Sequence, residues 1–402
     1  MNLLKDGIAN HAVERTPQTR KLTIDGLTKA YPVFRIRLDW LFYNDQNDRI
    51  ATWISKYRAQ HQGKTPDSAD REAYNKIIEE FIVESNRDKM RATQANIELF
   101  DQREAGVVLN DGRIIDGNRR FTCLRRLAEK NDRFRYFEAV ILDRDIENSA
   151  KQIKMLELSI QHGEESKVDY NPIDRLVGIY HDVVETNLLS EEEYAKSTNE
   201  TLPDIRRRME LSKLMVEFLD FINAHDQFYI ARDLQIYYPL DELLKLLKKA
   251  HTEDEKEDIK HTVFHNILMQ PASDMTRFVR NFKAIIGTQY QDEFLEEQKE
   301  LAEQTLDRLP AEGGITSAVI RDQIRNNEEI ESAMSRSMDK TMTKVKKNET
   351  RNRPIQLAEK ATTFLEGIDG NILQKMNDTE LQRLARQLDR MEDVIQELRE
   401  NL

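Results

Sequence analysis

The residues of this sequence most able to do chemistry stand together between a strand-like run and a helical pattern: Asp116, Gly117, Asn118, Arg119 and Arg120. Glycine lets the backbone turn sharply because it has no Cβ atom to clash. The first amides of the following helix have no partner within that helix, and they lie at the positive end of its dipole. A phosphate there would accept hydrogen bonds from these amides and from the two adjacent guanidinium groups. The stretch therefore indicates a phosphate site; the alternative is ordinary strand-to-helix punctuation with two solvated arginines.

The composition suits a helix-rich protein with modest cores, because 33% of the 402 residues are charged and 39% are apolar. The net charge of −12 argues against a chain that coats nucleic acid non-specifically, although a local basic face is compatible with it. The single cysteine, Cys123, excludes a disulfide framework and a cysteine-rich zinc site, and its leucine neighbours predict a buried, unreactive thiol. Since neither a signal peptide nor a run of about 18 apolar residues is present, we expect a soluble, cytoplasmic protein with no membrane partner.

The periodicity of the apolar residues divides the chain into a mixed part and a helical part. Residues 1–30 are expected to be a loosely ordered lead. Residues 31–150 contain two strand-like runs, helical stretches, and a hairpin with Asp111-Gly112 at its turn. After Lys151 the strand signals vanish and the pattern is helical. The expected fold class is therefore α+β.

The C-terminal residues carry the most regular pattern of the chain. Apolar residues step by three and four at Leu381, Leu384, Leu388, Met391, Ile395, Leu398 and Leu402, which is the seam of a coiled coil. Just before them, residues 335–353 contain seven basic and two acidic residues without a large apolar face. We therefore expect a basic linker followed by C-terminal helices that form a coiled coil and join two chains into a homodimer; the alternative is that the seam folds back on its own chain.

Three stretches follow one another along the chain: "LDWLFYNDQNDR", "NDGRIIDGNRRFTCLRRL" and "LSIQHGEESKVDYNPIDRL". Taken in this order they resemble the three boxes of the ParB/sulfiredoxin-like superfamily. The first keeps Asn44 and Arg49 of that family's pattern, and the second is the Asp-Gly-Asn-Arg-Arg form of its Gly-Glu-Arg-Arg box. The resemblance covers about residues 31–225 and implies a ParB/sulfiredoxin-like α/β domain.

The resemblance also implies a site for a nucleoside triphosphate, CTP in ParB proteins with ATP as the alternative, held with Mg²⁺. The residues it assigns to this site are Asn44, Arg49, Asp116, Gly117, Asn118, Arg119, Arg120, Gln161 and His162. The metal-holding Glu-Asn pair of the family falls on Leu158 and Ser159, and leucine cannot ligate Mg²⁺, which prefers oxygen donors. Glu157, one residue away, is the remaining candidate for a metal ligand. Magnesium binding and hydrolysis therefore stay open, with at most a weak nucleoside triphosphatase expected.

The stretch "LLSEEEYAKSTNETLPDIRRRMELSKLMVEFLDFI" has the layout of the ParB helix-turn-helix. Ser190 and Glu193 form a capping box that begins the first helix. The residues of the second helix that would reach phosphates or guanine edges of double-stranded DNA are Arg206, Arg207, Arg208 and Lys213. Three consecutive arginines cannot share one helix face, so at most two would enter a groove. The alternative is a solvated basic face on a helical bundle.

These expectations combine into a domain plan. The parts are a ParB/sulfiredoxin-like nucleotide-binding domain at 1–155, a helical domain at 156–334 with a helix-turn-helix at about 188–215, a basic linker at 335–356, and C-terminal helices with a coiled coil at 357–402. The implied function is a ParB-like, nucleotide-dependent DNA-binding protein of a plasmid, phage or other mobile element. It would act as a dimer beside a partition-type ATPase.

Two alternatives from other classes remain. The same superfamily contains phosphotransferases that use ATP or ADP, and for that activity Glu104 is the candidate catalytic base. A catalytically degenerate adaptor is also consistent with Leu158. The arginine-rich helix discriminates among them, because a small-molecule kinase does not need it.

Overall fold

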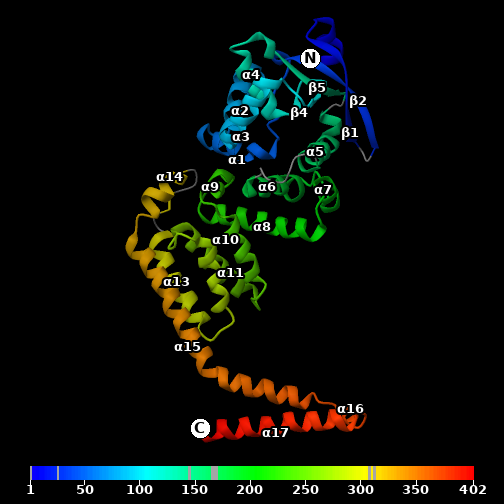
Figure 1. The fold of residues 1–402 in the computed structure, drawn as a ribbon. Coiled ribbons are helices and arrows are strands. Elements are labelled where there is room, and N and C mark those ends of the chain that lie inside the picture. The colour runs from blue at the N-terminus through cyan, green and yellow to red at the C-terminus, as the bar shows by residue number, and fades with distance from the viewer. Residues whose placement is uncertain (1, 25–26, 144–145, 164–170, 307–308, 311–313) are drawn as a thin grey trace. The chain divides into compact units, whose positions relative to one another are not determined.

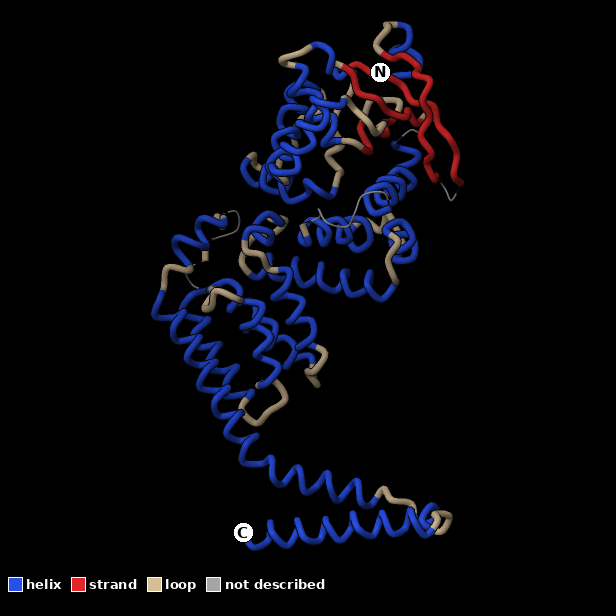
Figure 2. The backbone as a smooth tube through the Cα atoms, in the orientation of Figure 1, coloured by secondary structure: helices blue, strands red, loops and turns tan. Residues whose placement is uncertain are grey.

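The computed structural model describes residues 2–24, 27–143, 146–163, 171–306, 309–310 and 314–402. The chain forms two compact units, Met1–Ser337 and Met338–Leu402. The fold is α+β, as predicted, with many helices and one five-stranded sheet in the N-terminal part of the chain (Figure 1, Figure 2). Within the described ranges, no helix combines the length and the apolar character that crossing a membrane requires.

The sheet positions the stretch at residues 116–120. Its strands are β1 (Val13–Ile24), β2 (Leu27–Arg37), β3 (Gly106–Leu109), β4 (Ile114–Asp116) and β5 (Tyr136–Leu142), in the order β1-β2-β5-β3-β4. Strands β3 and β5 are parallel, and the other neighbouring pairs are antiparallel. The predicted hairpin joins β3 to β4 through Gly112, which has a φ of 94°. The chain then passes from edge strand β4 through α4 (Asn118–Ala128) to β5, so α4 begins directly after the edge of the sheet.

The expectation of a loosely ordered lead is wrong for the described residues of 1–30. They form the π-helix η1 (Leu3–Gly7) and β1, which pairs with β2 over most of its length. The apolar positions of β1 that are buried, Val13, Leu22 and Ile24, are separated by a long polar run. This alternation is too sparse to predict a strand, and the pairing with β2 supplies the hydrogen bonds that no local pattern records.

Alternation along the short strands sends neighbouring residues to opposite faces of the sheet. Val108 and Ile114 belong to a core that includes residues of α2 (Arg71–Ser85), α3 (Arg87–Phe100) and α4, with α1 (Ala51–Gln60) packed against it. Val107 and Ile115 belong to a second core with α5 (Ile146–Gly163). The sheet therefore lies between two cores, and α4 and α5 approach it from opposite faces.

The middle of the chain is helical. It contains α6 (Pro172–Ile179), η5 (Tyr180–Glu185), α7 (Glu191–Thr198), α8 (Leu202–Phe221), α9 (Phe228–Asp233), α10 (Tyr237–Leu247), α11 (Glu253–Met269), α12 (Met275–Asn281), α13 (Gln291–Leu306) and α14 (Ser317–Val319). Past Lys151 the described residues contain no strand, as predicted. Helix α5 crosses the expected boundary after residue 155: Leu156 packs in the sheet core, whereas Leu158 packs with α7 and α8. The sheet and the helices after it thus share α5.

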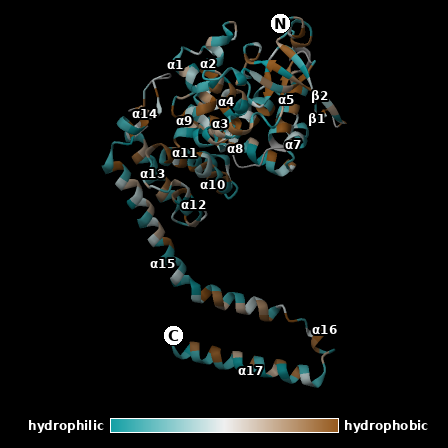
Figure 3. Ribbon diagram, turned by 45° about the horizontal axis from the view of Figure 1, so that its top comes forward, coloured by the Kyte–Doolittle hydropathy of each residue, from teal (hydrophilic) through white to brown (hydrophobic). Residues whose placement is uncertain are grey.

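The expected linker at 335–356 is wrong, because these residues lie within α15 (Glu328–Glu366). Met334, Met338, Thr341 and Val345 recur at helical spacing and are buried. The basic residues between them hide this stripe in the sequence, and lysine, arginine and methionine favour helices. The second unit contains α15 from Met338 onward, α16 (Gly370–Leu373) and α17 (Asp378–Glu400), and Figure 3 shows apolar residues recurring along α17.

Candidate functional site

Helix α4 begins on a glycine. Gly117 has a φ of 100°, in the left-handed region that favours glycine, and it offers no side chain to cap the helix. The first amide to bond within the helix is that of Phe121, which donates to the Gly117 carbonyl oxygen at 2.9 Å. The amides of residues 118–120 therefore lie at the positive end of the dipole, as the sequence predicts.

The start of α4 forms one wall of a cavity of about 450 Å³. This volume is in the range of small-molecule sites. The other walls come from η3 (Asp48–Ile50), α2, α3, residues 101–104 and α5. The predicted site residues that line the cavity are Arg49, Glu104, Asp116, Gly117, Asn118, Arg119, Arg120 and Gln161. Segments that are far apart in the sequence thus meet where the phosphate site is expected.

Two carboxylates hold Arg120 in the cavity wall. Its Nη1 lies 2.9 Å from Glu104 Oε2, and its Nη2 lies 3.1 Å from Asp116 Oδ2. Arg20 of β1 contacts the same Asp116 oxygen at 2.8 Å. The Glu104 side chain is 79% exposed, whereas those of Asp116 and Arg120 are only 12% and 15% exposed. Since exposed ion pairs contribute little, the less exposed pair with Asp116 contributes more than that with Glu104 to the position of Arg120.

The ring of Phe137 packs directly against the turn at Gly117. A Cβ atom added to Gly117 would lie 2.7 Å from Phe137 Cζ, and one added to Gly106 would lie 2.3 Å from the same atom. The Gly106 Cβ would also lie 2.6 Å from the backbone oxygen of Asp116. Both glycines are therefore required by the close approach of strand, turn and ring.

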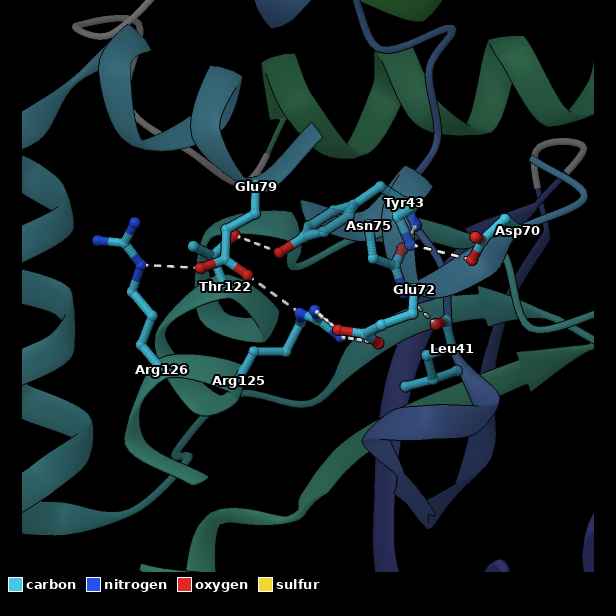
Figure 4. Close-up of polar contacts among 10 residues, drawn as sticks. Leu41, Tyr43, Asp70, Glu72, Asn75, Glu79, Thr122, Arg125 and Arg126 are labelled. Atoms are coloured by element: carbon cyan, nitrogen blue, oxygen red, sulfur yellow. Dashed lines mark hydrogen bonds and ion pairs between the residues drawn. The ribbon is translucent and has the colours of Figure 1, made fainter. Parts of the chain in front are cut away.

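Polar contacts join the last turn of α4 to α2 (Figure 4). Glu79 of α2 accepts hydrogen bonds from Arg125 at 3.0 Å and from Arg126 at 2.9 Å. Next to them, the hydroxyl groups of Tyr43 and Thr122 are 2.7 Å apart. A ligand at the start of α4 would therefore meet a helix whose position is already set.

Cys123 lies on the same helix and is fully buried, as predicted. Burial raises the pKa of its thiol to about 12. The thiol therefore stays protonated at neutral pH, and a protonated thiol is a poor nucleophile.

Asn44 and Glu157 lie behind the cavity rather than in its wall. They line a separate space of about 10 Å³. Glu157 Oε2 accepts a hydrogen bond from Asn44 Nδ2 at 3.3 Å, and its Oε1 accepts one from Gln161 Nε2 at 3.0 Å. Burial raises the pKa of Glu157 to about 8, although the nearby Lys154 ammonium lowers it. The candidate metal ligand is thus a buried carboxyl that orients Gln161.

Lys154 is the centre of a buried ion cluster that the sequence does not predict. Its Nζ lies 2.7 Å from Asp48 Oδ1 in η3 and 3.3 Å from Asp182 Oδ2 in η5. Burial lowers the pKa of Lys154, but Asp48, Asp182 and Glu157 together raise it well above the ordinary value. The ammonium is therefore charged and joins the segment beside Arg49 to the helical middle of the chain.

Two helices, α7 and α8, joined by a three-residue turn, lie where the sequence predicts a helix-turn-helix. The capping box of Ser190 and Glu193 is present. Asn199 begins the turn with a φ of 53°. Tyr194 of α7 and Ile205 of α8 are buried in one core with Leu158 of α5, which fixes the angle between the helices.

The three arginines of α8 lie in different ion pairs. Arg206 Nε contacts Glu191 at 2.7 Å, and Arg207 contacts Asp241 of α10. Arg208 contacts Glu200 in the turn at 2.6 Å, with both side chains mostly buried. Arg208 therefore braces the turn and is not available to DNA without breaking this pair, which corrects its predicted role.

The charges around Glu200 support this role. Burial alone raises the pKa of Glu200, but the hydrogen bond and charge of Arg208, together with Arg175, bring it down to about 2. Arg206 is largely exposed, and Lys213 also lies on the exposed side of α8.

The predicted role of His162 at the nucleotide site depends on a side chain that lies outside the described part of the chain.

Sequence reasoning missed three cations near the site. Arg20 lies in the stretch expected to be a loose lead, so nothing marked it. Lys154 stands three residues before Glu157, a spacing that places both on one helix face, and this was the only available signal. Arg103 lines the cavity next to Glu104.

Comparison with known proteins adds nothing to these observations, because no protein-family model, curated protein or solved structure matches the chain.

Proposed function

We propose that this chain is a ParB-like, nucleotide-dependent DNA-binding protein, with a nucleoside triphosphate held at the start of α4. CTP is the favoured nucleotide and ATP the alternative. One observation carries the proposal: Arg49, residues 117–120 and Gln161, which come from the three boxes, line one cavity. A cavity at a helix N-terminus that is also lined by guanidinium groups is suited to a polyphosphate.

The residues would divide the work of binding. The glycine turn lets a phosphate approach the amides of residues 118–120, and Arg49 and Arg119 add forked donors. Gln161 would bind from the opposite wall. Since Leu158 stands where the family has a metal-holding glutamate, turnover as a nucleoside triphosphatase is expected to be slow or absent.

The remainder of the proposal concerns partners. The helix-turn-helix would contact double-stranded DNA through Arg206, Arg207 and Lys213. The apolar stripe of α17 would join two chains into a homodimer. Such a protein would serve a plasmid, phage or other mobile element in the cytoplasm, beside a partition-type ATPase.

Calorimetry with CTP, ATP, GTP and UTP tests the nucleotide site. We expect the wild-type chain to bind CTP most tightly and Arg119→Ala to weaken binding by tenfold or more, which is about 1.4 kcal/mol. Arg126→Ala is the matched control, because Arg126 is on the same helix but pairs with Glu79 outside the cavity. If the chain binds none of the four, or if both variants behave alike, the proposed site is wrong.

A second candidate function is an ATP- or ADP-dependent phosphotransferase, and the position of Glu104 favours it. Glu104 is exposed, contacts Arg120, and lines both the α4 cavity and a neighbouring cavity of about 460 Å³ beside β1. A carboxylate between a donor site and an acceptor site can take the proton of an acceptor hydroxyl. For this function Glu104→Gln would abolish transfer of labelled phosphate from ATP to hydroxyl acceptors while nucleotide binding is unchanged; no transfer by the wild-type chain argues against it.

A further inference from the structure

The resemblance to ParB proteins implies Mg²⁺ beside the triphosphate, so the oxygen donors near the cavity decide whether the ion fits. Mg²⁺ requires near-octahedral oxygen coordination, usually from one or two carboxylates together with phosphates and waters. In the part of the chain that the structure describes, no group of three or more His, Cys, Asp or Glu side chains is arranged to hold a metal ion. Two sets of carboxylates come nearest to this requirement.

The first set lies in the cavity wall. Asp116 faces the guanidinium groups of Arg20 at 2.8 Å and Arg120 at 3.1 Å, and Glu104 faces that of Arg120 at 2.9 Å. A divalent cation at either carboxylate would lie close to at least one fixed positive charge and would be repelled by it. These carboxylates therefore hold the arginines in place and are poorly suited to a metal.

The second set surrounds Lys154. Asp48, Glu157 and Asp182 are buried and come from three different elements, a grouping that can suit a cation. The ammonium of Lys154 already lies among them, 2.7 Å from Asp48 and 3.3 Å from Asp182. The adjoining space of about 10 Å³ has room for at most one water, and Mg²⁺ usually keeps several. The chain's own cation thus already occupies this cluster.

Positive charge is also present where the phosphates would lie. The guanidinium groups that line the cavity are those of Arg49, Arg103, Arg119 and Arg120. A guanidinium group is a planar fork that can bind phosphate oxygens in pairs, and the α4 dipole adds positive potential at the same place.

We propose that the chain binds the polyphosphate of its nucleotide without a divalent cation, and that arginine side chains provide the neutralisation that Mg²⁺ supplies in other sites. This inference rests on the nucleotide function proposed above. It specifies the ligand as the free, metal-less nucleotide and assigns Glu157 to hydrogen bonding with Asn44 and Gln161.

The test compares calorimetric titrations of the full chain with CTP and ATP in excess EDTA and in excess Mg²⁺. We expect the affinity in EDTA to be no more than about threefold weaker than in Mg²⁺, which corresponds to about 0.7 kcal/mol. Glu157→Gln should show the same independence of the buffer, because the amide keeps the size of the side chain and one oxygen that can still accept the hydrogen bond of Gln161. Mn²⁺ titrated alone, followed by electron paramagnetic resonance, should show the same weak binding for wild type and Glu157→Gln.

The outcomes separate the inference from the function on which it rests. Loss of more than about threefold in affinity in EDTA, or a Glu157→Gln variant that loses Mn²⁺, overturns the inference and leaves the nucleotide function standing. Arg119→Ala should weaken binding equally in both buffers, which ties the signal to the cavity. Absence of binding in both buffers overturns the nucleotide function and the inference together.

Discussion

At the scale of single residues, Lys154 has a buried ammonium that lies within ion-pair distance of two buried carboxylates. The ammonium lies where η3, α5 and η5 meet, and both carboxylates come from outside its own helix. A buried charge costs several kcal/mol in desolvation, so removing one partner of such a group leaves an uncompensated charge. The cluster is thus a place where one substitution has a large and specific effect.

Lys154→Met should lower the free energy of unfolding by about 3–5 kcal/mol, because Asp48 and Asp182 are left buried without a counter-ion. Urea unfolding followed by the fluorescence of Trp40 and Trp53 measures this. Lys151→Met is the matched control on the same helix: its pair with Glu193 is half-exposed, so the loss should stay below about 1 kcal/mol. Equal effects of the two substitutions would contradict the importance of the cluster.

Glu157 predicts a pH dependence with a definite sign. Its folded pKa is about 8 against an ordinary value of 4.5, so the folded chain holds a proton that the unfolded chain releases between these two values. The contribution is fully present below the ordinary pKa and is lost as the pH rises to about 8. Glu157→Gln cannot titrate, and the fall in unfolding free energy between pH 5 and 8 should be shallower by up to about 1.4 kcal/mol per pH unit. Parallel slopes for variant and wild type would show that this carboxyl titrates normally.

Residues 116–120 were predictable from the sequence, whereas the Lys154 cluster was not. A turn glycine and a helix start are encoded within a few adjacent residues, so their geometry is local. Asp48 is 106 residues from Lys154, and only the folded chain brings the two together. The resemblance to the three boxes assigned Arg49 and Gln161 to the same cavity. It did not predict Arg20, which forms an ion pair with Asp116 and lies on β1, a strand that the sequence pattern did not indicate.

At the scale of elements, the arginines of the α7–α8 pair have two different roles: one forms a mostly buried ion pair in the turn, and another is exposed. Arg208 and Glu200 lock the turn between the helices, while Arg206 lies on the outer surface. Periodicity predicted both helices and their cap, because these are local signals. It did not reveal which arginine is buried, since that depends on where Glu200 lies after the turn has formed.

Arg208→Ala should therefore reduce the thermal stability of the chain, by about 1.5–3 kcal/mol for hydrogen bonds to a charged partner. Arg206→Ala should change stability by less than about 1 kcal/mol, because its ion pair is exposed. Circular dichroism melts of the two variants decide this. If Arg206→Ala is the more destabilising variant, the assignment of the two roles is reversed.

DNA binding gives the complementary expectation. Replacing Arg206, Arg207 and Lys213 with alanine should weaken binding to duplex DNA and reduce the slope of log affinity against log salt by about one for each lost phosphate contact. Fluorescence anisotropy across a salt series measures both quantities. A slope that does not change would place the DNA contact elsewhere or exclude it.

At the scale of the whole molecule, the second unit carries apolar surface that it does not bury. Leu388, Met391 and Ile395 of α17 are between 41% and 46% exposed, and Phe364 of α15 is 78% exposed. An apolar stripe in water is unfavourable by about 25 cal/mol per Å². Apolar residues recur along α17 as the sequence predicts, but no sequence pattern specifies what covers them.

The double variant Leu388→Asp and Ile395→Asp should convert a dimer into a monomer. Light scattering should give twice the chain mass of 47.3 kDa for wild type and one chain mass for the variant. Gln396→Asp is the control, because residue 396 lies outside the seam and the chain should stay dimeric. A wild-type chain that is monomeric at all concentrations would mean that the stripe is not a dimer interface.

The Phe137 ring beneath the turn also limits which residues can replace the two glycines that contact it. Phe137 leaves no room for a side chain at position 106 or 117, and the backbone of Asp116 independently restricts position 106. A smaller residue at 137 would relieve the clash with the ring at both glycines, but the left-handed backbone at 117 would still favour glycine. In a saturation library selected only for folded protein, positions 106 and 117 should therefore return almost no alternatives, whether or not the cavity ever meets a nucleotide. If homologues always have glycine at these two positions, the reason is therefore the fold. Whether homologues keep an arginine at position 119 says more about selection for ligand binding.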